Sequence, residues 1–369
     1  MRPDKTKRIN RYFVRAKFSH HVILGGDGMK NAAGIIRVAV SSAVCAAVML
    51  FDLYIFSGLY GKPRANADAE KGKTQSVTET VTTSGESTEN GKENASSAVA
   101  AAAESAAVGK ILNKFISPYT ANTCYNNVYL KNSTNLPVDI KGMLSEPLTF
   151  KIEKSEEPQV LIVHSHATES FLTETRDYYT AADATRSRDN NLNTVALGKI
   201  IADKLNAAGI KTLHSENQHD YPDYNYSYTN AAKTIKAALK EHPSIKIVID
   251  LHRDAVGAPG GDKVKVTTKI NGKSAAQIML VMGSQSGDTT DFPDYRENLK
   301  LAVRFQQTLE VMYPSLARSI SLVSNNYNES LTKGSMLLEV GTDANSLEEV
   351  KYSAELAANA LISLLNTLT

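Results

Sequence analysis

The stretch VLIVHSHATESF, residues 160–171, places two histidines and a glutamate directly after a run of aliphatic side chains. A second, mostly aliphatic run at 247–251 leads into His252, and a third at 336–338 leads into Glu339. Short runs of this kind are typical of buried strands in a parallel sheet. In open α/β sheets the carboxyl ends of parallel strands share one edge, where binding sites are built. The sequence therefore predicts one site assembled from three separate strands.

Strand-like and helix-like segments alternate from residue 110 to the end of the chain. The expected strands cover residues 160–164, 210–213, 245–250, 278–282, 319–323 and 336–340. The expected helices cover residues 193–208, 230–241, 295–312 and 346–365. Asn271-Gly272 predicts a hairpin turn. This alternation predicts an α/β fold, in which a mainly parallel sheet is flanked by helices on both faces.

His166 and Glu169 form an H-x-x-E pair in the loop after the first of these strands, and His252 follows a later strand. Imidazole and carboxylate are ligands of catalytic zinc, and three protein ligands leave a fourth position for water. Glu339 is then the candidate general base, which accepts the proton of the water and returns it to a leaving amine. The sequence predicts a Zn²⁺ site at His166, Glu169 and His252, with Glu339 as the catalytic residue.

Three neighbouring residues are candidates for supporting roles. His164 either replaces His166 as a ligand or supports a ligand through a hydrogen bond. Asp250 either orients His252 or is an ordinary turn or solvent-facing acid. Arg253 either clamps a substrate carboxylate through two hydrogen bonds or forms a structural ion pair. The other histidines of this region are expected at the surface: His214, His219 and His242.

The first 37 residues contain nine Lys and Arg against two Asp, a net charge of +7. An apolar segment follows at 38–60, interrupted by Asp52, and it is long enough to cross a hydrocarbon core of about 30 Å. The positive-inside rule then puts the N-terminus in the cytoplasm and the chain beyond the segment outside. A buried core helix and a signal peptide cleaved at Ala65-Asn66-Ala67 are the alternatives.

Residues 61–109 are expected to form a disordered linker, because they are rich in Thr, Ser, Glu, Gly and Asn and cannot bury a core. Residues 110–369 are expected to form an extracytoplasmic catalytic domain. Residues 59–369 carry a net charge of −4, which argues against nucleic-acid binding. Cys45 and Cys124 are too few for a disulfide framework.

Four stretches resemble the stage II sporulation protein P family: VYLKNST at 128–134, VLIVHSHATESF at 160–171, IVIDLHRDA at 247–255 and LLEVGTDANSLEEV at 337–350. The resemblance extends to the order of basic leader, single membrane span, linker and body. The family comprises membrane-anchored cell-wall hydrolases of endospore-forming bacteria, related to zinc-dependent N-acetylmuramoyl-L-alanine amidases. The resemblance implies a phosphorylase/hydrolase-like, zinc amidase-like α/β domain.

The resemblance also implies an activity and a setting. The activity is hydrolysis of the amide bond between N-acetylmuramic acid and the L-alanine of the stem peptide in peptidoglycan, with endopeptidase activity on cross-links as a further capability. The implied process is septal peptidoglycan thinning and engulfment at the sporulation septum. The implied partners are a lytic transglycosylase and a polytopic membrane protein of sporulation.

The amidase pattern requires a histidine after the first strand, a glutamate ligand, a histidine after a middle strand and a glutamate after a late strand. His166, Glu169, His252 and Glu339 meet these requirements. Amidases of this type place the glutamate ligand at the start of the first helix, where this chain has residues 190–193, Asn-Asn-Leu-Asn, without a glutamate. Glu169 is therefore assigned the ligand role by its chemistry.

Two other functions fit the same residues. A zinc carboxypeptidase-like peptidase of the cell wall also uses this ligand set, and Arg253 is the candidate for its terminal carboxylate. A catalytically idle scaffold that recruits other wall enzymes is the alternative outside enzymology, and it needs no stoichiometric zinc. Product analysis of digested peptidoglycan separates the two enzymes, and metal analysis identifies the scaffold.

Overall fold

The computed structural model describes residues 107–369. The basic leader, the predicted membrane span at 38–60 and residues 61–106 of the predicted linker lie outside this range. Among residues 107–369, no helix combines the length and apolar character that a membrane crossing requires. The first described element is strand β1 (Ala107–Lys114), which begins just before the expected domain start at residue 110.

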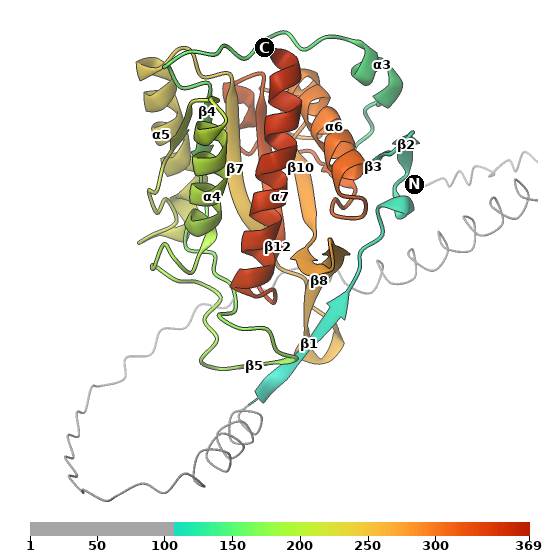
Figure 1. Ribbon diagram of the computed structural model, residues 1–369, viewed down its shortest axis with the longest axis vertical. Helices are drawn as coiled ribbons and strands as arrows, with labels where there is room; N and C mark the ends of the chain where they lie inside the picture. The colour runs from blue at the N-terminus through green and yellow to red at the C-terminus, as the bar shows by residue number, and fades with distance from the viewer. Residues whose placement is uncertain (1–106) are drawn as a thin grey trace, which may run out of the picture. The chain divides into compact units, whose positions relative to one another are not determined.

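An eight-stranded sheet, in the order β2-β3-β11-β10-β12-β7-β4-β6, forms the centre of the fold (Figure 1). Its strands are β2 (Thr123–Tyr125), β3 (Val128–Asn132), β4 (Val160–Val163), β6 (Thr212–His214), β7 (Ile247–Asp254), β10 (Ile278–Met282), β11 (Ile320–Leu322) and β12 (Ser335–Thr342). Strands β6, β4, β7 and β12 are parallel, and so are β10, β11 and β3. The junctions β10–β12 and β2–β3 are antiparallel. The sheet is therefore mixed, with mainly parallel pairs.

Helices cover both faces of this sheet, as the sequence predicted. They are α3 (Ile140–Ser145), α4 (Thr194–Ala207), α5 (Ser227–Glu241), α6 (Tyr295–Met312) and α7 (Leu347–Leu365). Helices α4 and α6 both contact α7, which runs between them on one face (Figure 1). Helix α5 covers the other face, where Ile235 packs with Leu161 and Val163 of β4 and Val248 of β7.

The ends of two helices follow directly from the sequence. The side chain of Asn193 accepts a hydrogen bond from the backbone N–H of Val195, which caps the start of α4. Ser346 and Glu349 form a reciprocal capping box at the start of α7. The asparagine-rich stretch that lacks the expected glutamate ligand thus has a structural role in starting α4.

A second, four-stranded sheet has the order β5-β1-β8-β9. Besides β1 it contains β5 (Tyr178–Thr180), β8 (Lys263–Ile270) and β9 (Lys273–Ala276). The predicted hairpin is confirmed, because β8 and β9 are antiparallel and joined at Asn271 and Gly272, whose φ angles are 49° and 80°. The sequence did not predict the other two strands, which are short or largely exposed and lack an aliphatic run.

Strands β7 and β12 are longer than their aliphatic runs, so His252 and Glu339 lie within strands. The alternation of side chains along β7 then places the site on the face of the sheet that α5 covers. Strand β7 continues to Asp254, so His252 lies within the strand. The parallel register pairs Glu339 with His252 and Leu337 with Asp250. Alternate residues of a strand point to the same face. Asp250 and His252 therefore share the face of Val248, which α5 covers.

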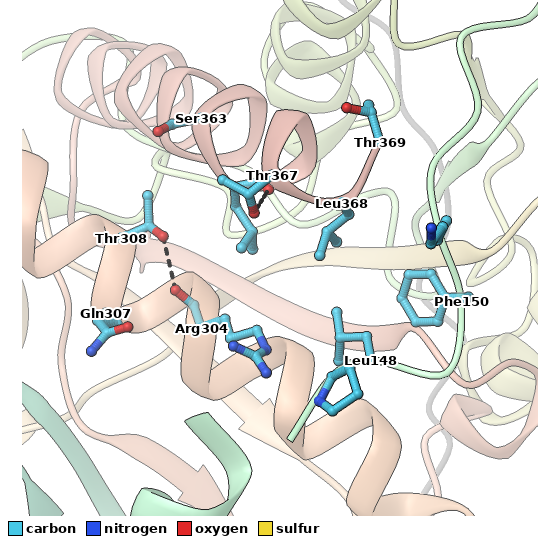
Figure 2. A pocket seen from close by; sticks show the side chains of 12 residues that line it. Leu148, Phe150, Arg304, Gln307, Thr308, Ser363, Thr367, Leu368 and Thr369 are labelled. Atoms are coloured by element: carbon cyan, nitrogen blue, oxygen red, sulfur yellow. Dashed lines mark hydrogen bonds between the residues drawn. The ribbon is translucent and has the colours of Figure 1, made fainter. Parts of the chain in front are cut away.

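The chain also has a pocket of about 530 Å³ near its C-terminus, between α6, the end of α7 and the segment after α3 (Figure 2). Leu148, Phe150, Arg304, Leu368 and Thr369 are among the residues that line it. No predicted site residue contributes to this pocket. The predicted site residues therefore lie outside this pocket.

Candidate metal centre

The three predicted ligands lie together. His166, Glu169 and His252 each offer one atom to a cluster in which all the atoms are within 4.8 Å of one another. Nδ1 of His166 is 3.6 Å from Oε1 of Glu169, and Nδ1 of His252 is 3.5 Å from Oε2 of Glu169. Tetrahedral zinc with bonds of about 2.0–2.1 Å separates its ligand atoms by roughly 3.3 Å. Each histidine lies within a few tenths of an ångström of this separation from one oxygen of Glu169, so the three residues could hold a zinc ion.

Each imidazole is oriented through its other ring nitrogen. Nε2 of His166 is 3.0 Å from Oγ of Ser227, the first residue of α5. Nε2 of His252 is 3.0 Å from Oδ1 of Asp250, and the two buried side chains form an ion pair. Both histidines consequently turn Nδ1 toward Glu169. Ligand histidines in metal sites are commonly held in this way through the second nitrogen.

The electrostatics of the cluster favour a positive charge. Burial alone would lower the pKa of His252, but the carboxylates of Asp250 and Glu169 outweigh it and hold that pKa well above its usual value. Burial alone would raise the pKa of Glu169, yet hydrogen bonds with His166 and His252 keep that pKa well below its usual value. An enclosed pair of carboxylates that retains its charge beside two imidazoles is a suitable environment for a divalent cation.

Glu339 lies on β12 beside His252 and completes the predicted set. Its Oε2 is enclosed and has no hydrogen-bond partner among the described residues. Burial raises the pKa of Glu339 to about 8, with smaller contributions from Glu169 and Asp254, while His252 and Arg318 oppose the shift. A cation at the cluster would favour the ionised form of Glu339 and thus make it available as a base.

His164 belongs to a separate contact. Its Nδ1 lies 3.1 Å from the carbonyl oxygen of Leu251, and its Nε2 lies 2.9 Å from Nε2 of His214. Burial lowers the pKa of His164 to about 3, so the imidazole is neutral. The structure groups His166, and not His164, with Glu169 and His252. His164 instead braces the backbone directly before His252.

Arg253 is not placed to clamp a substrate carboxylate, contrary to one of the two sequence-based interpretations. Its guanidinium donates hydrogen bonds to the carbonyl oxygens of Ser170 at 2.9 Å, Thr185 at 2.6 Å and Asp254 at 3.3 Å. Its backbone N–H donates to Oε2 of Glu169 at 3.2 Å. Arg253 therefore ties the loop after β4 to β7 and helps to fix Glu169. The partners of the guanidinium are backbone carbonyl groups, and the charge of Arg253 helps to lower the pKa of Glu169.

The expectation of a surface position is wrong for His219. Its side chain is buried, with Nδ1 2.8 Å from the carbonyl oxygen of His164 and Nε2 2.8 Å from Oγ1 of Thr234. His219 thereby joins the loop before α5 to the end of β4. Nothing in a loop sequence indicates which of its histidines turns inward, because that depends on the elements packed against it.

Tyrosines next to the cluster were missed by the sequence reasoning. Tyr224 stacks on His166 with ring centroids 4.6 Å apart, and Tyr228 stacks on His252 at 6.2 Å while meeting His166 edge-on at 5.3 Å. The guanidinium of Arg186 lies over the ring of Tyr224, with its Cζ 4.6 Å from the ring centroid. The available signal was the Tyr-rich segment before and at the start of α5.

The fold and the site define an α/β protein with an enclosed His–Glu–His centre and an unpaired glutamate beside it. Residues 59–362 match the family model described as stage II sporulation protein P, and the chain belongs to this family. Stage II sporulation protein P of Bacillus subtilis (strain 168) is 30% identical over 211 residues, which cover 54% of this chain and 49% of that protein. The chain thus matches about half the length of this curated relative.

Solved structures with partial similarity include two amidases. The CwlD amidase from Clostridioides difficile, solved in complex with the GerS lipoprotein, is 13% identical with a TM-score of 0.36, covering 57% of this chain and 98% of that chain. The N-acetylmuramoyl-L-alanine amidase AmiC2 of Nostoc punctiforme is 10% identical with a TM-score of 0.35, covering 58% and 97%. At these scores neither structure assigns an activity or a residue role to this chain.

The geometry predicts the effect of removing one ligand. We expect His252→Ala to abolish stoichiometric zinc in the folded chain, because loss of a ligand exceeds the about 10–100-fold loss in affinity that follows loss of a supporting contact. Asp250→Asn should show that smaller loss. Zinc content after dialysis and chelator competition measure both effects, with His242→Ala as a control away from the cluster. Full zinc occupancy in His252→Ala would contradict this site.

The buried His164 predicts a pH dependence of stability. The unfolded chain binds a proton at this imidazole below about pH 6.5, whereas the folded chain does so only near pH 3. The free energy of unfolding should therefore fall as the pH is lowered through this window, by about 1.4 kcal/mol per pH unit for one proton. When the free energy of unfolding of the metal-free protein is measured with urea at several pH values, it should change less steeply with pH in His164→Gln than in wild type. Equal slopes in both proteins would refute the assignment.

Proposed function

We propose that this chain is a zinc-dependent N-acetylmuramoyl-L-alanine amidase that cleaves the amide bond between muramic acid and the stem peptide of peptidoglycan. The observation that carries the proposal is the buried cluster of His166, Glu169 and His252 with the unpaired carboxylate of Glu339 beside it. Membership in the stage II sporulation protein P family supports the substrate class. Hydrolysis of stem-peptide cross-links at the same centre is an additional activity within this proposal.

The residues divide the chemistry among them. His166, Glu169 and His252 would hold the zinc ion, which would supply a positive charge for the scissile carbonyl group and a bound water of lowered pKa. Glu339 accepts the proton of that water and returns it to the nitrogen of L-alanine as the carbon–nitrogen bond breaks. Asp250 keeps His252 in the ligating orientation throughout.

The alternative functions gain little from the described residues. A carboxypeptidase-like enzyme needs a cation for the terminal carboxylate of its substrate, and Arg253, the sequence-based candidate, is bound to backbone carbonyl groups. An idle scaffold needs neither a candidate metal-ligand set nor a carboxylate paired in register with one of its histidines, and the described residues bring both together. The amidase proposal uses both features.

The proposed setting is the membrane of the sporulation septum and the engulfing membrane. The apolar segment 38–60 would anchor the chain, with a cytoplasmic N-terminus and an extracytoplasmic catalytic domain. A lytic transglycosylase and other membrane proteins of sporulation are the proposed partners. A transglycosylase cuts glycan strands and an amidase removes their peptides, so the two activities are complementary on one substrate.

Substitution of Glu339 by Gln tests the proposed activity. The change preserves volume and removes the proton acceptor, so zinc binding and folding should remain while release of stem peptides falls by at least about 10²–10⁴-fold. Zinc content, melting temperature and muropeptide release are measured on one preparation. Glu348→Gln, an exposed position on α7, is the matched control. Turnover within a few-fold of wild type in Glu339→Gln would exclude Glu339 as the base.

The proposed topology has its own test. Protease added to intact protoplasts should release a soluble catalytic domain by cutting between residues 62 and 108, because this segment is expected outside the membrane and without a packed core. Immunoblotting against the domain detects the released fragment. A domain that is protected until the membrane is lysed would contradict the orientation.

A further inference from the structure

Tyr327 and Asn328, in the loop between β11 and β12, have an unusual backbone. Their φ angles are 49° and 61°, so two consecutive residues with side chains adopt the left-handed region. Asparagine adopts this region more readily than other residues with side chains, so Tyr327 is the unusual member of the pair. Backbone strain of this kind persists only where the surroundings impose it, and it is concentrated at functional sites. The position of the loop is therefore informative.

Hydrogen bonds of Asn328 and Glu329 fix the loop beside the metal centre. The side chain of Asn328 donates a hydrogen bond to the carbonyl oxygen of Tyr228 at 2.8 Å, which attaches the loop to the first turn of α5. Glu329 is buried, and its Oε2 accepts a hydrogen bond from the backbone N–H of Gly283 at 2.8 Å. Asn298 donates to the carbonyl oxygen of Glu329 at 2.7 Å. The strained pair is thus held between α5, α6 and the end of β10.

The ring of Tyr327 is separated from the candidate ligand His252 by one aromatic ring, that of Tyr228. Its ring centroid is 5.7 Å from that of Tyr228, which in turn stacks on His252. Burial is the main cause that raises the pKa of Tyr327, followed by the charges of Glu329 and then Glu339, while His252 opposes the shift. The hydroxyl makes no hydrogen bond to another described residue and remains a protonated donor.

We propose that the hydroxyl of Tyr327 donates a hydrogen bond to the carbonyl oxygen of the scissile amide as that oxygen becomes negatively charged. Tyrosine hydroxyls are among the side chains that stabilise such oxyanions. The water oxygen adds to the carbonyl carbon, the carbon–nitrogen bond breaks, and the proton travels through Glu339 to the amine. Tyr327 keeps its own proton throughout. This inference rests on the proposed amidase function.

The strained backbone has a physical reason in this proposal. An oxyanion donor must be held in position before the reaction, because reorganisation during the reaction would forfeit part of its effect. The contacts of Asn328 and Glu329 hold the backbone at Tyr327, and Tyr228 packs against its ring. Tyr228, in contrast, contacts both His166 and His252 through its ring, which suits a role in packing.

The test uses Tyr327→Phe in the full zinc-loaded chain, which keeps the ring and changes only the hydroxyl. We expect kcat for stem-peptide release to fall by about 10²–10³-fold, the usual loss for one oxyanion donor, with KM, zinc content and melting temperature unchanged. The matched control is Tyr295→Phe, because Tyr295 is also half-buried, packs against an aromatic ring and makes no side-chain hydrogen bond to a described residue.

A binding measurement gives a second readout that does not depend on turnover. The probe is a phosphinate in which a tetrahedral phosphorus replaces the carbonyl carbon of the muramoyl–L-alanine amide. Its affinity, measured by calorimetry, should fall in Tyr327→Phe by about the same factor as kcat/KM, because such a probe resembles the transition state. The affinity for N-acetylmuramoyl-L-alanyl-D-isoglutamine, measured in the Glu339→Gln background, should not change.

The outcomes separate the two proposals. If wild type is active and Tyr327→Phe matches it within about twofold, or binds the phosphinate equally well, the role of Tyr327 is refuted while the amidase function stands. If Tyr327→Phe lowers only the melting temperature, the residue is structural and the inference is again refuted. If wild type releases no stem peptides from peptidoglycan, the amidase function fails and the role of Tyr327 fails with it.

Discussion

The arrangement of the metal centre depends on the carboxylate of Asp250. It accepts hydrogen bonds from the backbone N–H and the hydroxyl of Ser165, at 2.8 and 2.6 Å, and it pairs with His252. One side chain thereby joins the end of β4 to β7 and sets the orientation of a ligand. Because Ser165 directly precedes His166, the same contacts fix the start of the loop that carries the other two ligands. A carboxylate in this position determines geometry as well as charge.

The site also concentrates polar groups where water is excluded. Buried charges are tolerated only when they are paired, hydrogen-bonded or bound to a metal. Asp250 and Glu169 satisfy this rule within the chain through Ser165, Arg253 and the histidines. Glu339 has no such partner at its enclosed Oε2, and burial raises its pKa to about 8, so its carboxyl group is mainly uncharged near neutral pH. This difference separates the groups that build the centre from the group that is free to exchange a proton.

Loops distant in sequence supply the surroundings of the strand residues. Asp220 accepts hydrogen bonds from the hydroxyl of Thr168 and from Arg186, both at 2.6 Å, which connects the segment before α5 to the loop that carries Glu169. Tyr224, four residues further along, closes one side of His166. The segment between β4 and α4, which carries His166 and Glu169, also contains β5 and is thereby joined to the second sheet. The strands provide the reactive groups, and these loops fix their positions.

The sequence by itself determined the elements of the site: aliphatic runs that must be buried, and His166, Glu169, His252 and Glu339 within or just after them. That much follows from local pattern, because burial and strand periodicity are properties of short segments. The direction of each side chain was decided only by the tertiary structure. His164 and His166 differ by two positions, yet the placement of β4 between β6 and β7 gives His164 the partners His214 and Leu251, while His166 joins the cluster. Contacts between segments that are distant in the sequence determine which of the two histidines joins the cluster, and a local sequence pattern contains no information on such contacts.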